Sequence, residues 1–237
     1  HWFGDMISPT RWSDIWLNEG FATYCETIWA EKMEGKTQYR RLNKINADSY
    51  LMTNPGRPIY NKAWDTLTPN NNVLFDVAMT YNKSGAILYM LRYVLGDSIF
   101  FSSVKRYATN PDLMYKNINT NEFVRLMSEY SNRDLTWFFE QWLYRPNHPV
   151  YDNRYEIKKD GDEWKVIFNV KQTQREEFFK MPIEIQIFFS KENKIVRLEN
   201  DYNNQSFELK FKDKPVQVVF DPNNEIILKK AKTVQGF

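Results

Sequence analysis

Two glutamates near the start of the sequence have a spacing that suits metal chemistry. Glu19 and Glu26 are seven residues apart, nearly two helical turns, so on a helix their carboxylates share one face. A carboxylate can bind a metal ion directly, or it can hydrogen-bond to a histidine that does so. The chain has two histidines, His1 and His148. Because one carboxylate without a pair of imidazoles is a weak zinc site, the residues alone indicate only part of a metal centre.

A purely structural role is the alternative for each of these side chains. Taken alone, Glu19 is typical of a solvent-facing helix glutamate, because ionised side chains are mostly exposed. Glu26 is equally typical of a solvated surface charge, and the neighbouring Asn18 of a local structural residue. The segment 144–149, which contains His148, is interpreted as a domain joint and not as a second metal site.

Tyr81 is a tyrosine whose phenol could stabilise a developing negative charge. It lies in the segment 80–86, Thr-Tyr-Asn-Lys-Ser-Gly-Ala. A phenol has a reference pKa of about 10, so at neutral pH it stays protonated and can donate to an oxyanion. The alternative is a core tyrosine, since the chain contains 14 tyrosines.

Two further segments carry a specific resemblance. Residues 2–5 read Trp-Phe-Gly-Asp, and residues 12–22 read Trp-Ser-Asp-Ile-Trp-Leu-Asn-Glu-Gly-Phe-Ala. Together they resemble the aminopeptidase N family of zinc metallopeptidases, which also contains the leukotriene hydrolases. In that family a His-Glu-x-x-His helix supplies two zinc ligands, and a glutamate eighteen residues further on supplies the third. The register implies that Glu19 is the third ligand, whereas His1 fills the variable position after the second ligand and points off the metal face.

The resemblance assigns roles to the other candidates as well. It implies one zinc ion per catalytic site, with both histidine ligands missing from this chain. Tyr81 matches the tyrosine of the family's Tyr-x-Lys-Gly-Ala segment, which is the oxyanion donor there. Glu26 matches a position where the family commonly has glutamate, and it and Asn18 are expected to support the metal ligands from outside the metal's own shell. Ser84 departs from the family segment and leaves the register of the following helix open.

The implied activity is that of an aminopeptidase. The parent enzyme would remove N-terminal residues from peptides through a zinc-activated water, with the base in the missing upstream motif. Because the sequence opens inside a family motif, it is interpreted as a C-terminal fragment whose partner is the missing N-terminal part of the same protein. The fragment alone is expected to be inactive and to bind zinc poorly.

Other functions remain open at this point. The family segment Gly-x-Met-Glu-Asn, which binds the free amine of the substrate, lies upstream, so the preferred N-terminal residue is undetermined. An epoxide-hydrolysing relative fits the same motifs. The main alternative is a non-catalytic relative that acts as a protein-binding or scaffold module. An unrelated α+β protein would leave the agreement of both motifs to chance.

The apolar pattern divides the chain once. Up to about residue 145 apolar residues recur at helical spacing, and from about residue 150 they alternate. The pattern predicts an α+β protein with a helical part, residues 1–146, and an all-β sandwich, residues 147–237. The family resemblance implies that the first part is the helical half of a thermolysin-like metallopeptidase domain and that the sandwich is immunoglobulin-like.

Turn and cap signals predict the helices and strands of both parts. A first helix is expected from Ser13 as N-cap to a stop at Gly35, and a second from about Gly85 to Gly96. Three more are expected over 98–108, 120–130 and 134–144, the last with Asp134 as N-cap. In the second part, six or seven antiparallel strands are expected, with turns at 160–161 and 221–224.

Composition and charge exclude some functions and leave others open. With 42% hydrophobic residues the chain can bury a core, and a net charge of +2 predicts no field that would draw nucleic acid or an anionic membrane. No apolar stretch is long enough to span a bilayer. The single cysteine, Cys25, fits a reducing compartment and also fits large exported bacterial enzymes, so the localisation is unknown.

Overall fold

The computed structural model describes residues 2–236. The chain forms two compact units, His1–Asn147 and His148–Phe237, and each is described here by itself. His1, which the family register places off the metal face, lies outside the described residues.

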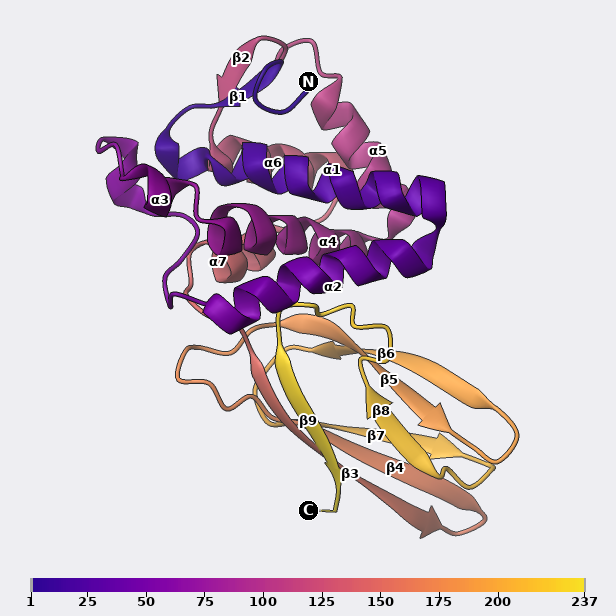
Figure 1. Cartoon of the computed structure of the whole chain (residues 1–237). Helices are drawn as coiled ribbons and strands as arrows, with labels where there is room; N and C mark the ends of the chain where they lie inside the picture. The colour runs from indigo at the N-terminus through magenta and orange to yellow at the C-terminus, as the bar shows by residue number, and fades with distance from the viewer. Residues whose placement is uncertain (1, 237) are drawn as a thin grey trace. The chain divides into compact units, whose positions relative to one another are not determined.

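The first unit is helical with one small parallel ladder (Figure 1). Its longest helices, α1 and α2, form an antiparallel hairpin joined at Gly35, whose φ of 90° lies in the region that favours glycine. The elements in chain order are β1 (Ile7–Pro9), η1 (Trp12–Asp14), α1 (Trp16–Glu34), α2 (Lys36–Thr53), η2 (Lys62–Asp65), α3 (Asn71–Leu74), the π-helical η3 (Val77–Lys83), α4 (Ser84–Leu95), α5 (Asp97–Ala108), β2 (Lys116–Ile118), α6 (Thr120–Ser131) and α7 (Thr136–Leu143).

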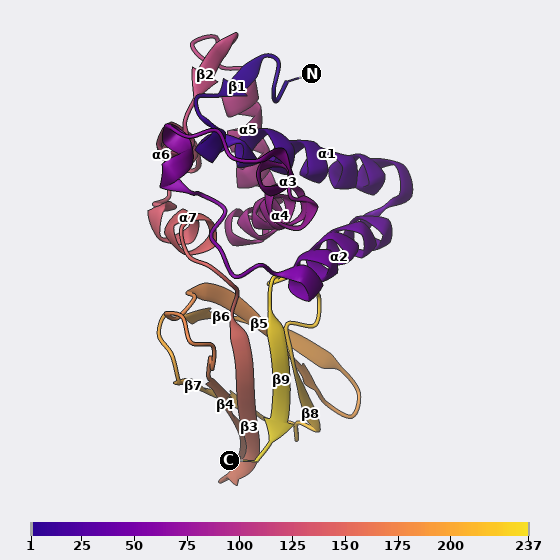
Figure 2. The same cartoon turned by 60° about the vertical axis from the view of Figure 1, so that its left-hand side comes forward.

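The core of the helical unit surrounds α4, which is buried along most of its length (Figure 2). Helix α1 turns one stripe toward this core, because buried side chains recur every three or four residues along it. Aromatic rings fill the space between α1, α6 and α7. Trp16 and Phe21 of α1 both meet the Phe123 ring edge-on, at centroid distances of 5.6 and 5.7 Å. This aromatic packing fixes the start of α1, which carries Glu19.

Most of the predicted helices are confirmed, but the first begins differently. Ser13 is not an N-cap: it lies in η1, and α1 starts at Trp16 with no side-chain cap. The reason is that the Ser13 hydroxyl donates to the Asp65 carboxylate of η2. Asp134 lies one residue before the N-cap Leu135, and its Oδ1 accepts from the Thr136 amide at 2.9 Å.

Helix α2 and the turn η3 were not predicted. The buried stripe of α2 contains Asn43 and Ala47 beside Tyr39 and Tyr50, so its apolar signal is weak. The ends of α1 at Gly35 and of α4 at Gly96 were predicted correctly. None of the helices within residues 2–236 combines the length and apolarity needed to cross a bilayer.

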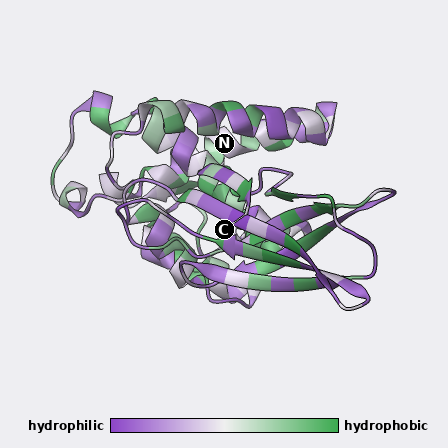
Figure 3. Ribbon diagram, turned by 90° about the horizontal axis from the view of Figure 1, so that it is seen from below, coloured by the Kyte–Doolittle hydropathy of each residue, from purple (hydrophilic) through white to green (hydrophobic). Residues whose placement is uncertain are grey.

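The second unit consists of two β-sheets. The strands are β3 (Val150–Asp160), β4 (Glu163–Val170), β5 (Met181–Phe188), β6 (Asn193–Asn200), β7 (Gln205–Phe211), β8 (Gln217–Phe220) and β9 (Lys230–Gln235). One sheet has the order β7-β4-β3-β9 and the other β6-β5-β8. Side chains alternate along the strands, as the bands of hydropathy in Figure 3 show, with Val166, Phe168 and Val170 of β4 buried.

The expectation of a wholly antiparallel arrangement was wrong in one place. Strand β9 pairs parallel to β3, from Val150 opposite Lys230 to Tyr155 opposite Gln235. The strand is mostly exposed, so it adds an edge to a sheet that β3, β4 and β7 already form. The predicted turn at 160–161 is present, because Asp160 pairs with Glu163 across a two-residue connection.

Candidate active site

Glu19 lies in the first turn of α1 and is half-buried. Its carboxylate lies close enough to the phenol of Tyr81 for each group to shift the pKa of the other. Burial raises the pKa of Glu19 above its usual value, and the hydrogen bond from Tyr81 partly offsets that rise. The structure therefore brings together two residues that are far apart in the sequence and that were both selected for their chemistry.

Tyr81 lies on η3 and is also half-buried. Burial raises the pKa of its phenol, and the nearby negative charge of Glu19 and the hydrogen bond to it raise the pKa further. The phenol is therefore neutral at physiological pH and keeps its proton for donation. A π-helical turn at this point is notable, because such turns occur frequently at functional sites.

A close crossing of α1 and α4 explains why the two residues meet. A Cβ placed on Gly20, next to Glu19, would lie 2.8 Å from the Cβ of Ser84. A Cβ on Gly85 would lie 3.1 Å from a methyl carbon of Thr23. The two glycines thus let α1 pass against the start of α4, directly after the turn that carries Tyr81. Ser84, which departs from the family segment, occupies this crossing and fits because residue 20 has no side chain.

Hydrogen bonds to Thr120 of α6 also hold the start of α1 in place. The Asp14 carboxylate, which is buried, accepts from the backbone amide of Thr120 at 2.8 Å and from its hydroxyl at 2.7 Å. The indole of Trp16 donates to the same hydroxyl at 2.9 Å. Because Thr120 opens α6, these bonds hold the beginning of α1 against the N-terminus of another helix.

Asn18, the residue before Glu19 in the sequence, lines a pocket whose lining does not include Glu19 itself. The pocket has a volume of about 540 Å³ and is lined by Trp12, Ile15, Asn18, Trp64, Asp65 and Leu67 among others. Its rim carries the ion pair between Arg11 and Asp65, at 3.1 Å. The side chain of Asn18 also lies over Gly4, where an added Cβ would be 3.3 Å from the Asn18 Nδ2. Asn18 is thus positioned by the 2–5 segment as well as by α1.

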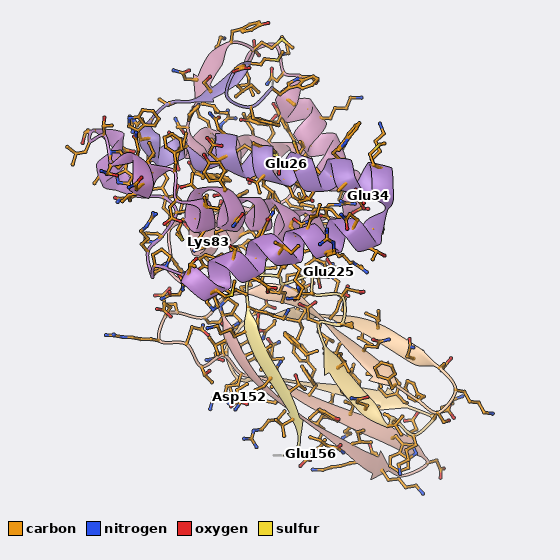
Figure 4. The ribbon with its side chains drawn as sticks, viewed as in Figure 1. Glu26, Glu34, Lys83, Asp152, Glu156 and Glu225 are labelled. Atoms are coloured by element: carbon orange, nitrogen blue, oxygen red, sulfur yellow. The ribbon has the colours of Figure 1, made fainter. Side chains whose placement is uncertain are left out.

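Glu26 lies midway along α1 and is exposed (Figure 4). Among residues 2–236 it makes no hydrogen bond to Glu19, Asn18 or Tyr81. His148 is buried in the second unit and is not part of this site.

The fit of this site to a metal ion can be judged from its donors. Within residues 2–236 there is no group of three His, Cys, Asp or Glu side chains arranged to hold a metal. Glu19 offers one half-buried carboxylate beside the Tyr81 phenol, which suits one ligand of a zinc site. The described residues therefore fit a contribution of one ligand and not a complete site.

Two features of the site were not anticipated from the sequence. The pocket depends on Trp64 and Asp65 of η2, a segment for which no helix was predicted. Lys83, two residues after Tyr81, is fully buried. The sequence did show a lysine in the same motif as Tyr81. Its burial could not be inferred, because it lies over Tyr50 of α2, a helix that was not predicted.

Known proteins match this chain over both its sequence and its fold. The peptidase family M1 domain matches residues 1–142. Aminopeptidase N of Lactococcus lactis subsp. lactis is 30% identical over 152 residues, which cover 63% of this chain and 18% of that protein. Probable aminopeptidase 1 of Sulfurisphaera tokodaii is 24% identical over 196 residues, covering 78% of this chain and 23% of that protein.

A solved structure shows the same fold. The crystal structure of Legionella pneumophila aminopeptidase A in complex with aspartic acid matches with a TM-score of 0.69 at 17% identity, over 98% of this chain and 25% of that chain. The chain thus spans about a fifth of the length of the curated relatives it matches, as the 18% coverage of the Lactococcus protein shows.

Proposed function

Because this chain belongs to peptidase family M1, a family of zinc aminopeptidases, we propose that it carries part of an aminopeptidase active site. In this proposal Glu19 is one zinc ligand and Tyr81 is the hydrogen-bond donor to the oxyanion. The observation that supports the proposal is the proximity of these two side chains, which lie far apart in the sequence and influence each other's pKa. It places a neutral phenol within reach of whatever the Glu19 carboxylate binds.

The roles of the two side chains follow from their environments. Zinc, when bound with two imidazoles and one carboxylate, supplies Lewis-acid activation of a water and of the peptide carbonyl. Glu19 would hold its carboxylate toward the metal, and its partial burial favours a charged partner over solvent. Tyr81 would keep its proton on Oη and donate it as a hydrogen bond to the oxygen that becomes negative.

The neighbouring residues complete the proposal. The pocket beside Asn18 would receive part of the peptide, since its lining combines the Trp12 and Trp64 rings with polar groups. Asn18 and Glu26 would hydrogen-bond to groups that hold the metal, and Glu26 is exposed and so accessible to an incoming imidazole. Peptides with a free N-terminus are the proposed substrates.

We also propose finer identities for the two units. The helical unit corresponds to the helical half of a thermolysin-like catalytic domain, supported by the family match over residues 1–142. The second unit corresponds to an immunoglobulin-like sandwich, supported by its four-stranded and three-stranded sheets. The two would be separate domains with their boundary at about residue 147.

The 237-residue chain by itself is proposed to be inactive. Its described residues contain no three-ligand group, and one carboxylate binds zinc weakly. Equilibrium dialysis followed by metal analysis is the direct check. Zinc retained at one equivalent by the 237-residue chain would contradict this part of the proposal.

The role of each residue is tested on the polypeptide that the intact gene encodes. Glu19→Gln should abolish both zinc retention and hydrolysis of aminoacyl nitroanilides, because an amide is a poorer ligand than a carboxylate. Tyr81→Phe should keep the zinc and lower kcat by about 10²- to 10³-fold, the usual effect of removing one oxyanion donor. Glu140→Gln, on α7, is a matched control that should change neither quantity.

The outcomes separate the aminopeptidase from the alternative function. A Glu19→Gln variant with full zinc and full activity would overturn the ligand assignment. An intact polypeptide that retains no zinc and hydrolyses no aminoacyl substrate would instead favour a non-catalytic module of the same fold.

A further inference from the structure

Lys83 is the most unusual charged residue of the helical unit. It is fully buried, and within residues 2–236 its Nζ has no hydrogen-bond partner. Its nearest aromatic neighbour is Tyr50 of α2, whose ring centroid lies 5.0 Å from Nζ. Figure 4 shows Lys83 on the η3–α4 segment, between α4 and α2.

Such a lysine is unfavourable for the fold. Burial, with a smaller contribution from the nearby Arg57 charge, lowers the pKa of Lys83 to about 7. An apolar side chain of similar size would fill the same space without this penalty. Residues that break a packing rule in this way are expected where the structure serves a function.

The turn that contains Lys83 is held at both ends. At its start, the Asp76 Oδ1 accepts from the Met79 amide at 3.1 Å, and the Thr80 hydroxyl donates to the Leu74 carbonyl at 2.6 Å. At its end, the Ser84 hydroxyl donates to the Met79 carbonyl at 3.2 Å. None of these three bonds involves the side chain of Tyr81 or Lys83.

Two side chains of the turn point to nearly opposite sides, because they are two residues apart on a helix. Tyr81 lies toward α1, where the Glu19 charge raises the pKa of its phenol. Lys83 points toward α2 and lies over the Tyr50 ring. A movement of Lys83 relative to Tyr50 would therefore rotate Tyr81 relative to Glu19.

We propose that Lys83 is a positioning residue for Tyr81: enclosed against the Tyr50 ring, it sets the rotation of the π-helical turn and so the position of the Tyr81 phenol relative to Glu19. The catalytic meaning of this coupling rests on the function proposed above. The coupling itself is a property of the helical unit.

Charged and titratable groups around Lys83 come from three directions. Tyr50 faces it from α2, and its hydroxyl donates to the Asn147 carbonyl at 3.0 Å. Arg57 lies on the loop after α2 and pairs with Asp76 at 3.4 Å. Glu19, with Tyr81, lies on the far side of the turn. Proton uptake near neutral pH is therefore assigned to Lys83 itself.

The test reads the environment of Tyr81 without requiring zinc or activity. The chain is labelled with tyrosine carrying ¹³C at Cζ, and the Tyr81 resonance is assigned by its loss in Tyr81→Phe. In the wild-type chain the Tyr81 resonance should shift with a midpoint of about pH 7 as Lys83 gains its proton. In Lys83→Met, which keeps the volume and loses the charge, this step should be absent.

Tyr130 of α6 is the internal control, since it lies against Arg106 and not against η3, and its resonance should show no such step. A step that persists in Lys83→Met, or a Tyr81 resonance that is flat through pH 7 in the wild type, would overturn the proposal. Neither result bears on zinc retention, so failure of this coupling is distinct from failure of the proposed function.

A second pair of variants tests the contact itself. Tyr50→Leu removes the ring and should displace the Tyr81 resonance, whereas Tyr50→Phe keeps the ring and should leave the resonance in place. Thermal unfolding of both variants verifies that they are folded. Equal displacement in the two variants would show that the ring contact does not position Tyr81.

Discussion

The two ends of helix α4 each carry a buried cation, and their surroundings are opposite. Arg92, at the C-terminal end, donates to Glu31 at 2.6 and 3.1 Å and to Asp97 at 2.8 and 3.0 Å. It also lies between the rings of Tyr39 and Phe101, at 4.9 and 4.7 Å. Lys83, just before the N-terminal end, has one aromatic neighbour and no hydrogen-bond acceptor among the described residues.

The pKa values reflect this difference. Burial alone would lower the pKa of Arg92, but its hydrogen bonds to Asp97 and Glu31 raise it above the usual value. For Lys83, burial acts without compensation. The comparison teaches that the fold satisfies a buried charge where it joins α1, α4 and α5, and leaves one unsatisfied beside the candidate active site.

Removal of Arg92 should have the largest effect on stability. Arg92→Met leaves the half-buried Glu31 carboxylate without its partner, so we expect the free energy of unfolding to fall by about 3–5 kcal/mol. Urea unfolding followed by circular dichroism measures this change. Arg125→Met, in an exposed pair with Glu129, is the control and should change stability by less than about 0.5 kcal/mol. Similar values for the two variants would remove the distinction between the ends of α4.

Lys83→Met should raise the free energy of unfolding, by an amount that depends on pH. The folded pKa of about 7 lies below the ordinary value of 10.5, so above pH 7 the unfolded chain binds a proton that the folded chain does not. The free energy of unfolding of the wild type should therefore rise with pH from about 7, by up to about 1.4 kcal/mol per pH unit from this group.

Lys83→Met lacks this term, so it should be the more stable protein at pH 7, with an advantage that shrinks toward pH 9. Urea unfolding of both proteins across this interval gives the two slopes. Parallel pH dependences would mean that Lys83 is charged and solvated in the folded state, contrary to its burial.

Gly20→Ala should disturb the crossing that joins the candidate residues. The new Cβ would lie 2.8 Å from the Cβ of Ser84, and overpacking of this kind typically costs about 1–3 kcal/mol. The Tyr81 resonance should shift in the same variant, because the crossing sets the distance between α1 and the turn. Ser84→Gly removes the Cβ contact and should restore part of the stability and of the resonance position in the double variant, because the backbone carbonyl carbon of residue 84 still lies 3.2 Å from the new Cβ. An equal loss with serine or glycine at position 84 would exclude this contact as the cause.

Asp97→Asn should have the smallest effect. The Asp97 side chain is 58% exposed, so its ion pair with Arg92 is screened by solvent, and a loss below about 1 kcal/mol is expected. Thermal unfolding of the variant beside Arg92→Met ranks the two partners of the arginine. If Asp97→Asn lowered the free energy of unfolding as much as Arg92→Met does, Asp97 and not Glu31 would be the more important partner of Arg92.

The local pattern of the chain predicted many elements well. Glycines marked the ends of α1 and α4, and alternating apolar residues marked β4 and β5. Both signals depend on residues within one element, where the helical or strand period is directly visible. Helix α2 was missed because its buried stripe includes Asn43 and Ala47, which carry little hydrophobic signal.

Long-range pairing was less accessible. The parallel addition of β9 to β3 reverses the expected direction, and a mostly exposed edge strand shows no alternation from which to infer it. Likewise Ser13 has the residue type of an N-cap, yet Asp65 of η2 takes its hydroxyl. In both cases the partner lies far away in the sequence, so local propensity could not reveal it.

The amino-acid order alone was sufficient to place this chain in its family and to select Glu19 and Tyr81, because motif residues and element periods are local properties. The tertiary structure alone decided that the Tyr81 phenol reaches the Glu19 carboxylate and that Lys83 is closed off from water. Both depend on how closely α1, α2 and the π-helical turn pack around α4. That distance is set by pairs such as Gly20 with Ser84, which become neighbours only in the folded chain.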